Sequence, residues 1–440
     1  MRKLCKLMSL ILAVLTVLSG CTTQMNLPES NAPRKPTDNV SAPENTVSDD
    51  EAAVSEDTVE PVYASMIPIS VNEENYYRYN DEEDTLMVDA YYTTMGVSAD
   101  GFERLDAALQ SLSKKSSEEI LSQAEEFYQM ALSDKEEREP SYEWNPYSTE
   151  CRAEVIRSDE KAVSVLETWY SFAGGAHPNT YYSAVNFDPA TGKKLEIRDI
   201  VSDTEVFAKC LEEETLKTVD KDMLLFEDIS EIINEKLDET ISDNELTFLL
   251  DYDGLEVIFS PYDITAYAAG AQRVRLNYSD YPELIDQSYA VIPENYIEKI
   301  QEDGTGYTGR PGQKDRKAVT FEELSDEYGT ISSCAVLLDG KAGQPDTEDY
   351  YYNSRKYIAH VGDKSFCLVE KQSDNDYTFM TIYDLNSDTA VKKGTVDGHI
   401  DSMTMPADPA ALRIVKRCNL LSTYSVVQLH RLNEDGSVTP

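Results

Sequence analysis

The sequence contains few of the residues that build metal centres. Its 440 residues include only four histidines, and His360, His399 and His430 all lie far along the chain from His177. None of them forms an H-x-x-H or H-x-x-x-H pair, the spacing at which neighbouring histidines share a metal ion. We therefore expect no metal site and no cofactor.

Cysteine is too sparse and too scattered for a disulfide framework. Of seven cysteines, Cys5 and Cys21 fall in the N-terminal leader, and the other five are widely spaced without a C-x-x-C pair. One disulfide bond between two of these five cysteines is the alternative if the protein is in an oxidising compartment. These five are Cys151, Cys210, Cys334, Cys367 and Cys418.

Motifs of hydrolytic active sites are also missing. The sequence has no G-x-S-x-G and no complete set of nucleophile, metal ligands or paired carboxylates. We therefore expect no catalytic residues and a protein that is not an enzyme. A cell-wall hydrolase or deacetylase is the alternative.

Positive charge is in short supply. The chain has 82 acidic and 39 basic residues, which gives a formal net charge of −43. A nucleic-acid-binding protein needs a basic stripe along the phosphates, so nucleic acid is excluded as a partner. An acidic surface attracts cationic partners, although acidity that only keeps an exported protein soluble is the simpler interpretation.

The N-terminus has the pattern of an exported lipoprotein. A basic beginning precedes an apolar run at residues 7–18, which is too short to span a membrane comfortably. Leu18-Ser19-Gly20-Cys21 then resembles the bacterial lipobox. We expect a signal peptide at 1–20, lipidation of Cys21 and a lipid anchor on the extracytoplasmic face of the membrane. An uncleaved membrane helix is the alternative.

Composition divides the rest of the chain. Residues 21–61 are mostly Ser, Thr, Asn, Asp, Glu and Pro, which predicts a disordered acidic tether. The following patterns predict an α+β class, with antiparallel sheets and packed helices in an N-terminal domain (62–141) and a central domain (142–292). A linker (293–317) and a small all-β domain (318–440) complete the prediction.

Periodic patterns predict the elements of these domains. Apolar residues at intervals of three and four between 101 and 132 predict an amphipathic helix, either continuous or broken at 114–117. Shorter helices are predicted at 204–219 and 230–237. The predicted strands are 66–71, 85–94, 162–170, 181–187, 246–250, 255–260, 273–276, 330–338, 357–361, 364–369, 378–383, 390–393, 412–416 and 424–432.

Two glycine-containing turns lie between predicted strands of the central domain. Gly174-Gly175-Ala176-His177-Pro178 joins two strands rich in β-branched and aromatic residues, so we expect a hairpin whose loop carries His177. Asp251-Tyr252-Asp253-Gly254 joins another pair, and we expect Gly254 there at a positive φ. The acids of this second turn lack the spacing of a calcium loop, so they fit turn chemistry better.

Two separated motifs carry a resemblance to a known family. The first is the 174–178 loop with the Asn186-Phe187-Asp188 and Thr191-Gly192-Lys193 turn, and the second runs from Phe259 to Gly270 (FSPYDITAYAAG). The region resembles the extracellular domain of RsiV-type anti-sigma factors, which also precedes the catalytic domain of PdaC-type peptidoglycan deacetylases. Residues 62–141 occupy the place of the companion domain. The resemblance implies binding at the cell surface, since RsiV-type proteins bind lysozyme through this region.

Tyrosine is the abundant aromatic residue. The chain has 28 tyrosines against two tryptophans, with runs such as Tyr350-Tyr351-Tyr352. Tyrosine suits sugar stacking and protein interfaces, although strand alternation alone also produces such runs. We expect a non-catalytic surface lipoprotein that binds a cationic wall-directed protein such as lysozyme, with peptidoglycan or another glycan as the alternative ligand. The candidate ligand-binding residues are His177, Asn179, Tyr181, Tyr182, Tyr262 and Tyr267.

Overall fold

The structure is a computed structural model that describes most of the chain beyond residue 61. The described residues are 62–80, 84–137, 144–226, 228–238, 246–300, 305–313, 315–348, 350–374, 377–417 and 425–440. The predictions for the signal peptide, for Cys21 and for the tether at 21–61 lie outside this part. The chain from residue 60 to residue 440 forms one compact unit.

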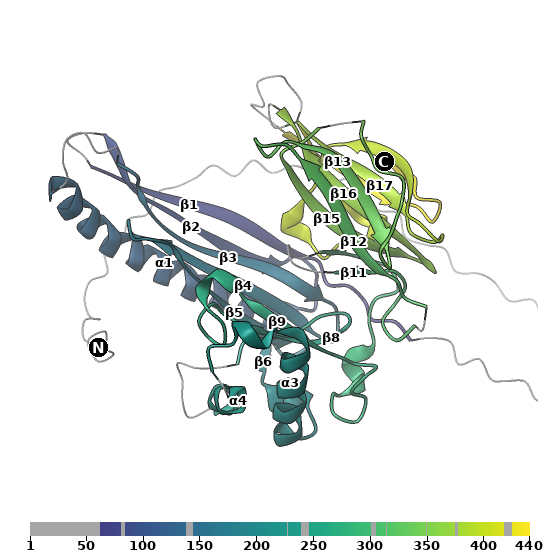
Figure 1. Cartoon of the computed structure of the whole chain (residues 1–440), viewed down its shortest axis with the longest axis horizontal. Coiled ribbons are helices and arrows are strands. Elements are labelled where there is room, and N and C mark those ends of the chain that lie inside the picture. Colours follow the sequence, from purple (N-terminus) through teal and green to yellow (C-terminus); the bar gives the residue numbers. More distant parts are fainter. Residues whose placement is uncertain are drawn as a thin grey trace, which may run out of the picture. The chain divides into compact units, whose positions relative to one another are not determined.

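A six-stranded sheet organises the first half of the described chain (Figure 1). Its strands lie in sequence order, and neighbours are antiparallel except for β2 and β3, which are parallel. Parallel neighbours need a crossover connection, and helix α1 (Glu103–Glu137) provides it. The strands are β1 (Ile69–Asn80), β2 (Thr85–Val97), β3 (Tyr147–Ser158), β4 (Val163–Phe172), β5 (Asn179–Asp188) and β6 (Lys193–Leu195).

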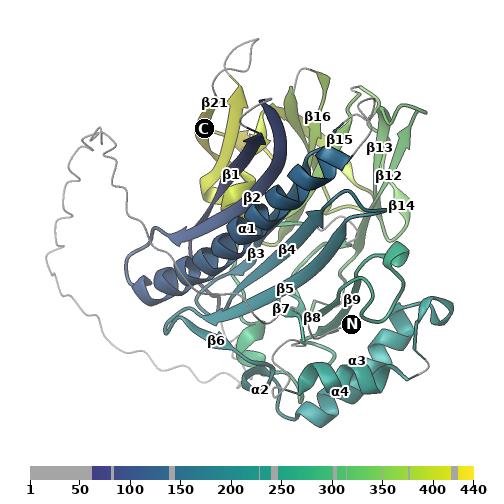
Figure 2. The ribbon, with the colours of Figure 1, turned by 90° about the vertical axis from the view of Figure 1, so that its left-hand side faces the viewer.

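Helix α1 lies along one face of this sheet (Figure 2). Its buried residues recur at intervals of three and four, as the apolar pattern predicted. The break considered at 114–117 does not occur, since α1 continues through these residues, and two serines on its buried face, Ser113 and Ser116, have partners in the sheet. Ser113 Oγ accepts a hydrogen bond from the Met95 amide at 2.9 Å, and Ser116 Oγ donates to the Glu167 carboxylate at 2.5 Å.

Three helices and a second sheet complete this half. Asn186 of β5 joins the two sheets, since its side-chain amide donates to the Phe248 carbonyl oxygen at 2.8 Å and its side-chain oxygen accepts from the Leu250 amide at 3.0 Å. Asp203 and Asp228 cap two of the helices by accepting from first-turn amides. The elements are α2 (Ile197–Ile200), α3 (Thr204–Thr218), α4 (Ile229–Leu237), β7 (Phe248–Leu250), β8 (Gly254–Phe259) and β9 (Gln272–Asn277).

Some predictions for this half differ from the structure. The first strand spans 69–80 instead of 66–71, and strand β3 was not predicted. Gly254 does not have a positive φ. A Cβ at this position would overlap the carbonyl oxygen of Leu276 on β9, so glycine is needed there for the close approach of two strands.

The predicted domain boundary between 141 and 142 falls between α1 and β3. Hydrogen bonding between β2 and β3 continues the sheet across it. Residues 62–141 and 142–292 therefore contribute strands to one common sheet.

The second half of the described chain is built of antiparallel strands (Figure 1, green to yellow), with short 3-10 turns between some of them. They form a five-stranded sheet in the order β10-β15-β16-β17-β18 and two four-stranded sheets, β11-β12-β13-β14 and β19-β20-β21-β22. The first half thus combines helices with sheets, and the second half consists of antiparallel strands; the parallel pair of β2 and β3 departs from the antiparallel sheets that the sequence predicted. The strands are β10 (Tyr296–Lys299), β11 (Gly306–Tyr307), β12 (Ala318–Ser325), β13 (Ile331–Leu338), β14 (Lys341–Ala342), β15 (Asn353–Val361), β16 (Lys364–Gln372), β17 (Thr378–Asp384), β18 (Val391–Asp397), β19 (His399–Ile400), β20 (Leu412–Arg417), β21 (Ser425–Leu432) and β22 (Val438–Thr439).

The predicted linker at 293–317 contributes to this β region. Strand β10 pairs with β15, and β11 pairs with β12. Among the described residues, no helix is long and apolar enough to cross a membrane.

Candidate functional site

Three of the predicted binding residues form an aromatic cluster, which we call the His177 surface: the exposed His177 and Tyr262, and the half-buried Tyr267 that contacts both. The His177 ring stacks on Tyr267 with a centroid distance of 4.3 Å, and Tyr267 lies 5.6 Å from Tyr262. His177 is exposed, and Tyr262 exposes 56% of its surface. The structure therefore brings both sequence motifs to one surface.

The His177 loop is positioned by the β4–β5 hairpin. Ser171 pairs with Asn179 at the hairpin end, and the intervening loop turns at Gly174, whose φ is 73°. His177 Nδ1 lies 2.7 Å from the carbonyl oxygen of Pro178. That contact fixes the ring orientation, so part of the function of His177 is to shape the loop.

Hydrogen bonds between distant segments hold the second motif beside the first. The Tyr182 amide donates to Ser260 Oγ at 3.0 Å, although the two residues are 78 positions apart. Thr247 Oγ1 donates to the Tyr182 carbonyl oxygen at 3.2 Å. Packing of β5 against the β7–β9 sheet is thus what assembles the surface.

The backbone of Tyr262 is unusual. Its φ is 74°, a conformation that is rare for a large side chain and carries strain. Neighbouring bonds maintain it, because the Tyr262 amide donates to the Thr265 carbonyl oxygen at 3.0 Å and Asp263 accepts from the Ser260 amide at 2.8 Å. Lys236 in turn pairs with Asp263 at 3.1 Å. The turn therefore keeps the Tyr262 backbone in a strained conformation while its ring is exposed.

The other three predicted residues lie on β5 and are not part of this stack. Strand alternation sends Tyr181 and Tyr182 to opposite faces of the sheet. Tyr181 stacks on Trp169 at 5.6 Å, and burial raises the pKa of its hydroxyl. Tyr182 packs with the cluster beneath the β7–β9 sheet, and Asn179 is exposed at the start of the strand.

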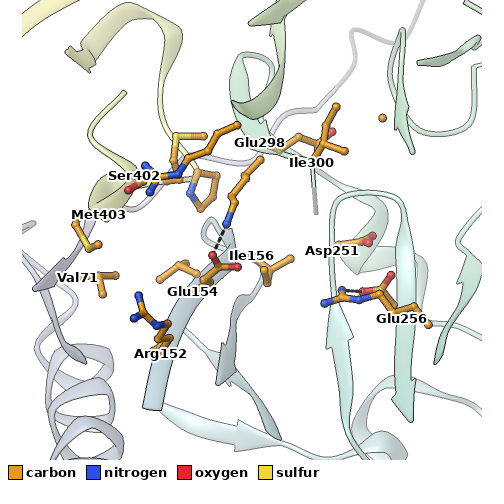
Figure 3. A pocket seen from close by; sticks show the side chains of 18 of the residues that line it. Val71, Arg152, Glu154, Ile156, Asp251, Glu256, Glu298, Ile300, Ser402 and Met403 are labelled. Carbon is orange, nitrogen blue, oxygen red and sulfur yellow. Dashed lines mark hydrogen bonds and ion pairs between the residues drawn. The ribbon is translucent and has the colours of Figure 1, made fainter. Parts of the chain in front are cut away.

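A charged cavity of about 490 Å³ lies elsewhere in the fold and was not predicted (Figure 3). Its walls carry both signs of charge, and the charges are largely paired with each other. Asp251 and Arg275 approach to 2.6 Å, Glu256 and Arg273 approach to 2.9 Å, and Glu154 pairs with Lys299. The cavity therefore has the character of a mutually compensated ion-pair network.

Asp251 and Asp253 serve the turn that the sequence predicted. Asp251 Oδ1 accepts from the amides of Asp253 and Gly254, at 2.8 and 2.7 Å. Burial raises the pKa of the Asp251 carboxyl to about 6, and the adjacent Arg275 opposes that shift. Asp253 pairs with Arg316, with one contact at 3.1 Å.

Metal-binding chemistry finds no support in the part of the chain that is described. No group of three or more His, Cys, Asp or Glu side chains there could hold a metal ion. His360 is buried, stacks on Tyr296 at 4.5 Å and places Nε2 3.8 Å from Glu298. The described cysteines Cys151, Cys210, Cys334 and Cys367 are free thiols, and Cys418 lies outside the described residues.

The tyrosine run Tyr350-Tyr351-Tyr352 was noted in the sequence but was not among the candidate binding residues. Its middle residue is fully buried, while its neighbours expose 51% and 49% of their surface. The isolated β-bridge between Tyr351 and Ile331 accounts for the buried residue. It does not explain why the two exposed positions are also tyrosine.

Comparison with known proteins places two family models on the chain. The model described as deacetylase PdaC matches residues 102–180, and the model described as a protein of unknown function (DUF3298) matches residues 203–279. The first match includes the His177 loop, and the second includes Tyr262 and Tyr267. Among curated proteins, none matches the chain.

Two solved structures are similar to about half of the chain. A DUF3298 family member from Bacteroides fragilis NCTC 9343 has 14% sequence identity and a TM-score of 0.38, covering 52% of this chain and 98% of that one. A DUF3298 family protein from Pseudomonas aeruginosa PAO1 has 16% identity and a TM-score of 0.34, covering 52% and 97%. The chain is thus similar to the PdaC model over residues 102–180 and to the DUF3298 model over residues 203–279, together less than half of its length.

Proposed function

We propose that this protein is a non-catalytic lipoprotein of the extracytoplasmic membrane face that binds a cationic wall-directed protein such as lysozyme through the His177 surface. The observation that carries the proposal is the contact of the exposed His177 and Tyr262 rings with the half-buried Tyr267 ring, assembled from two distant motifs. Exposed aromatic residues held in fixed positions are typical anchors of protein interfaces. The RsiV-type resemblance supplies the partner class.

Charge supports the same partner independently. A chain of net charge −43 attracts a basic enzyme over a long range and accelerates association. Attraction alone is unspecific, so the desolvated contact has to come from the aromatic rings.

Titration calorimetry of the full chain with lysozyme tests the proposal. We expect submicromolar binding that persists at about 0.15 M salt, where screening acts over about 8 Å. A Tyr262→Asn, Tyr267→Ser double variant should weaken binding at least about tenfold. Asparagine is chosen because it tolerates the positive φ at position 262.

The matched control replaces exposed tyrosines on β1, which β2 and β3 separate from the β4–β5 hairpin. Tyr77 and Tyr79 on β1 expose 48% and 44% of their surface, and Tyr77→Ser, Tyr79→Ser leaves the net charge unchanged. Equal weakening by both double variants, or binding that disappears at physiological salt, would reject the proposed surface.

A glycan is the second candidate ligand, because stacked exposed rings also suit sugar faces. Titration with soluble muropeptides under the same conditions separates the two ligands. Saturable muropeptide binding without lysozyme binding would transfer the function to glycan recognition. Release of acetate or muropeptides from peptidoglycan, lost in His177→Ala, would instead support the enzymatic alternative.

Anchoring is tested through Cys21. Cells labelled with a fatty-acid analogue should mark the wild-type protein and not Cys21→Ala. An unlabelled wild-type protein released into the medium would contradict the lipoprotein proposal.

A further inference from the structure

Four exposed tyrosines gather at one end of the C-terminal β region, and we call them the tyrosine tip: Tyr328, Tyr350, Tyr352 and Tyr377. They expose 82%, 51%, 49% and 52% of their surface. Large side chains exposed to this degree contribute little to the core of the protein. Several together mark a contact surface more strongly than single ones do.

Strand pairing brings the turns that carry these residues together. The β12–β13 hairpin, which carries Tyr328, closes where Ser325 pairs with Ile331, and Ile331 exchanges backbone hydrogen bonds with Tyr351 at 2.7 and 3.0 Å. The Tyr352 amide donates to the Gln372 carbonyl oxygen at 2.8 Å, where the β16–β17 hairpin begins. The tip is therefore set by the sheet and its turns.

Carboxylates hold the tyrosine hydroxyls. Asp374 accepts from Tyr350 at 3.0 Å and from Tyr352 at 2.9 Å, so the two rings meet edge to face at 6.5 Å. Asp397 accepts from Tyr377 at 2.6 Å. Each carboxylate keeps further acceptor positions. The Tyr350 and Tyr352 side chains stay about half exposed, while the Tyr377 ring stacks on Phe379 at 5.7 Å.

Positive charge is missing from these turns. None of the described residues in 324–330, 350–353, 372–378 and 396–398 is Lys or Arg, while the same segments contain Asp326 and Glu327 besides the two hydroxyl-binding acids. The hydrogen bond that Tyr352 donates to Asp374 is the main cause that raises the pKa of its hydroxyl, and the nearby charge of Asp326 adds to the shift. Two arginines lie beside these segments, since Arg355 and Arg417 line a small pocket with Asn353, Gln372 and Thr378; Arg355 is paired there with Glu370 at 3.4 Å.

We propose that the tyrosine tip binds a basic peptide segment of a partner protein. Lysine and arginine are attracted to tyrosine faces and to carboxylates, and the tip offers both within one surface. This chain already uses the same pairing internally, with Arg152 over the Tyr91 ring at 4.0 Å and Arg78 over the Tyr128 ring at 4.2 Å. A neutral glycan would use the rings and gain nothing from the charge.

The tip shares no residue with the His177 surface, so this inference does not rest on the proposed function. Either surface can fail its own test without affecting the other.

Titration of the full chain with a synthetic peptide alternating Arg, Lys and Gly tests the inference. A Tyr328→Ser, Tyr350→Ser, Tyr352→Ser triple variant should weaken binding at least about tenfold, because it removes the rings without changing the net charge. Tyr77→Ser, Tyr79→Ser is the matched control and should stay within about twofold of wild type. Asp374→Asn should weaken binding by a smaller factor, about threefold, since it removes one charge and keeps a hydrogen-bond acceptor.

Circular dichroism shows whether each variant is folded, and an acidic peptide of equal length should not bind. Equal affinity of the triple variant and wild type would overturn the inference, because attraction would then come from overall charge. Binding of a chito-oligosaccharide that the triple variant loses, without binding of the basic peptide, would also overturn it and assign the tip to a glycan.

Discussion

Replacing Asp346 by asparagine should lower the free energy of unfolding of the C-terminal β region more than neutralising an exposed charged side chain does. Asp346 is buried and accepts hydrogen bonds from Lys371 Nζ at 2.7 Å, from Lys392 Nζ at 3.0 Å and from the Tyr383 hydroxyl at 3.3 Å. The Lys371 side chain is fully buried. Its ammonium group therefore depends on Asp346 for its charge compensation.

The magnitude follows from the pKa and from burial. Although burial alone would raise it, hydrogen bonds from Lys371 and Lys392 lower the pKa of Asp346 to about 2 from its ordinary value of 3.8. That difference corresponds to about 2.5 kcal/mol of stability at neutral pH. Because the folded-state pKa is lowered, this contribution is present above the ordinary pKa and is lost as the pH falls through the folded value. Leaving a buried lysine unpaired costs about 3–5 kcal/mol, which is the expected loss for Asp346→Asn at pH 7.

Urea denaturation of the full chain, followed by circular dichroism, measures this loss. Hydrogen exchange of the β16 amides assigns the transition to the C-terminal region. Glu348→Gln is the control, since Glu348 shares Lys392 at 2.6 Å but its side chain is 76% exposed. A double variant with Asp346→Leu and Lys371→Met should recover most of the stability. If Asp346→Asn loses no more than Glu348→Gln, the reasoning from burial is wrong.

Three further outcomes are expected. Gly192→Ala should lower the thermal midpoint of unfolding far more than Gly270→Ala. Both glycines have a positive φ, but only at position 192 would a Cβ overlap the carbonyl oxygen of Arg104. Equal shifts of the two midpoints would contradict this prediction. Burial raises the pKa of Glu167, so its contribution to stability is full below the ordinary carboxyl pKa and declines as pH rises through the folded value. Glu167→Gln should therefore gain stability relative to wild type as the pH rises above the ordinary carboxyl pKa, and a difference that stays constant with pH would refute the shift. Iodoacetamide should modify the half-buried Cys210 well before the buried Cys151, Cys334 and Cys367. The reaction should be slow at neutral pH, because burial raises the pKa of all four thiols. Mass spectrometry of the digested protein checks the order of modification.

Elements with a clean periodicity could be predicted from the sequence, and elements with distant polar partners could not. The apolar positions of α1 predicted its buried face, but its continuity depends on Glu167, which accepts from Ser116 across the core. Strand β3 escaped prediction for a similar reason. Arg157 lies at its buried end and is paired with Asp159, while its guanidinium also donates to the carbonyl oxygens of Asp251 and Tyr289. Because these partners lie far along the chain, the sequence alone predicts an exposed position for a charged residue such as Arg157.

The candidate binding residues divide for a simple geometric reason. Motif matching located both segments of the His177 surface, and the hydrogen bond from Tyr182 to Ser260 explains why they meet. Neighbouring residues on β5 were predicted as one group, yet strand alternation sends Tyr181 and Tyr182 to different sides of the sheet. Only the packing of β5 against the β7–β9 sheet shows which face of β5 is turned towards the second motif.

Within the two motifs, burial separates residues that serve the fold from residues that remain available to a partner. Asn186 is buried and joins two sheets, and Asp263 accepts from the Ser260 amide to shape its turn. Tyr262 and Tyr267 have no comparable task, since their rings contact each other and His177 at the surface. Tyr262 even occupies a strained backbone conformation that asparagine or glycine would adopt at lower cost. We propose that this strained, exposed ring serves a contact outside the chain. The binding experiment therefore targets Tyr262 and Tyr267 and leaves the buried motif residues unchanged.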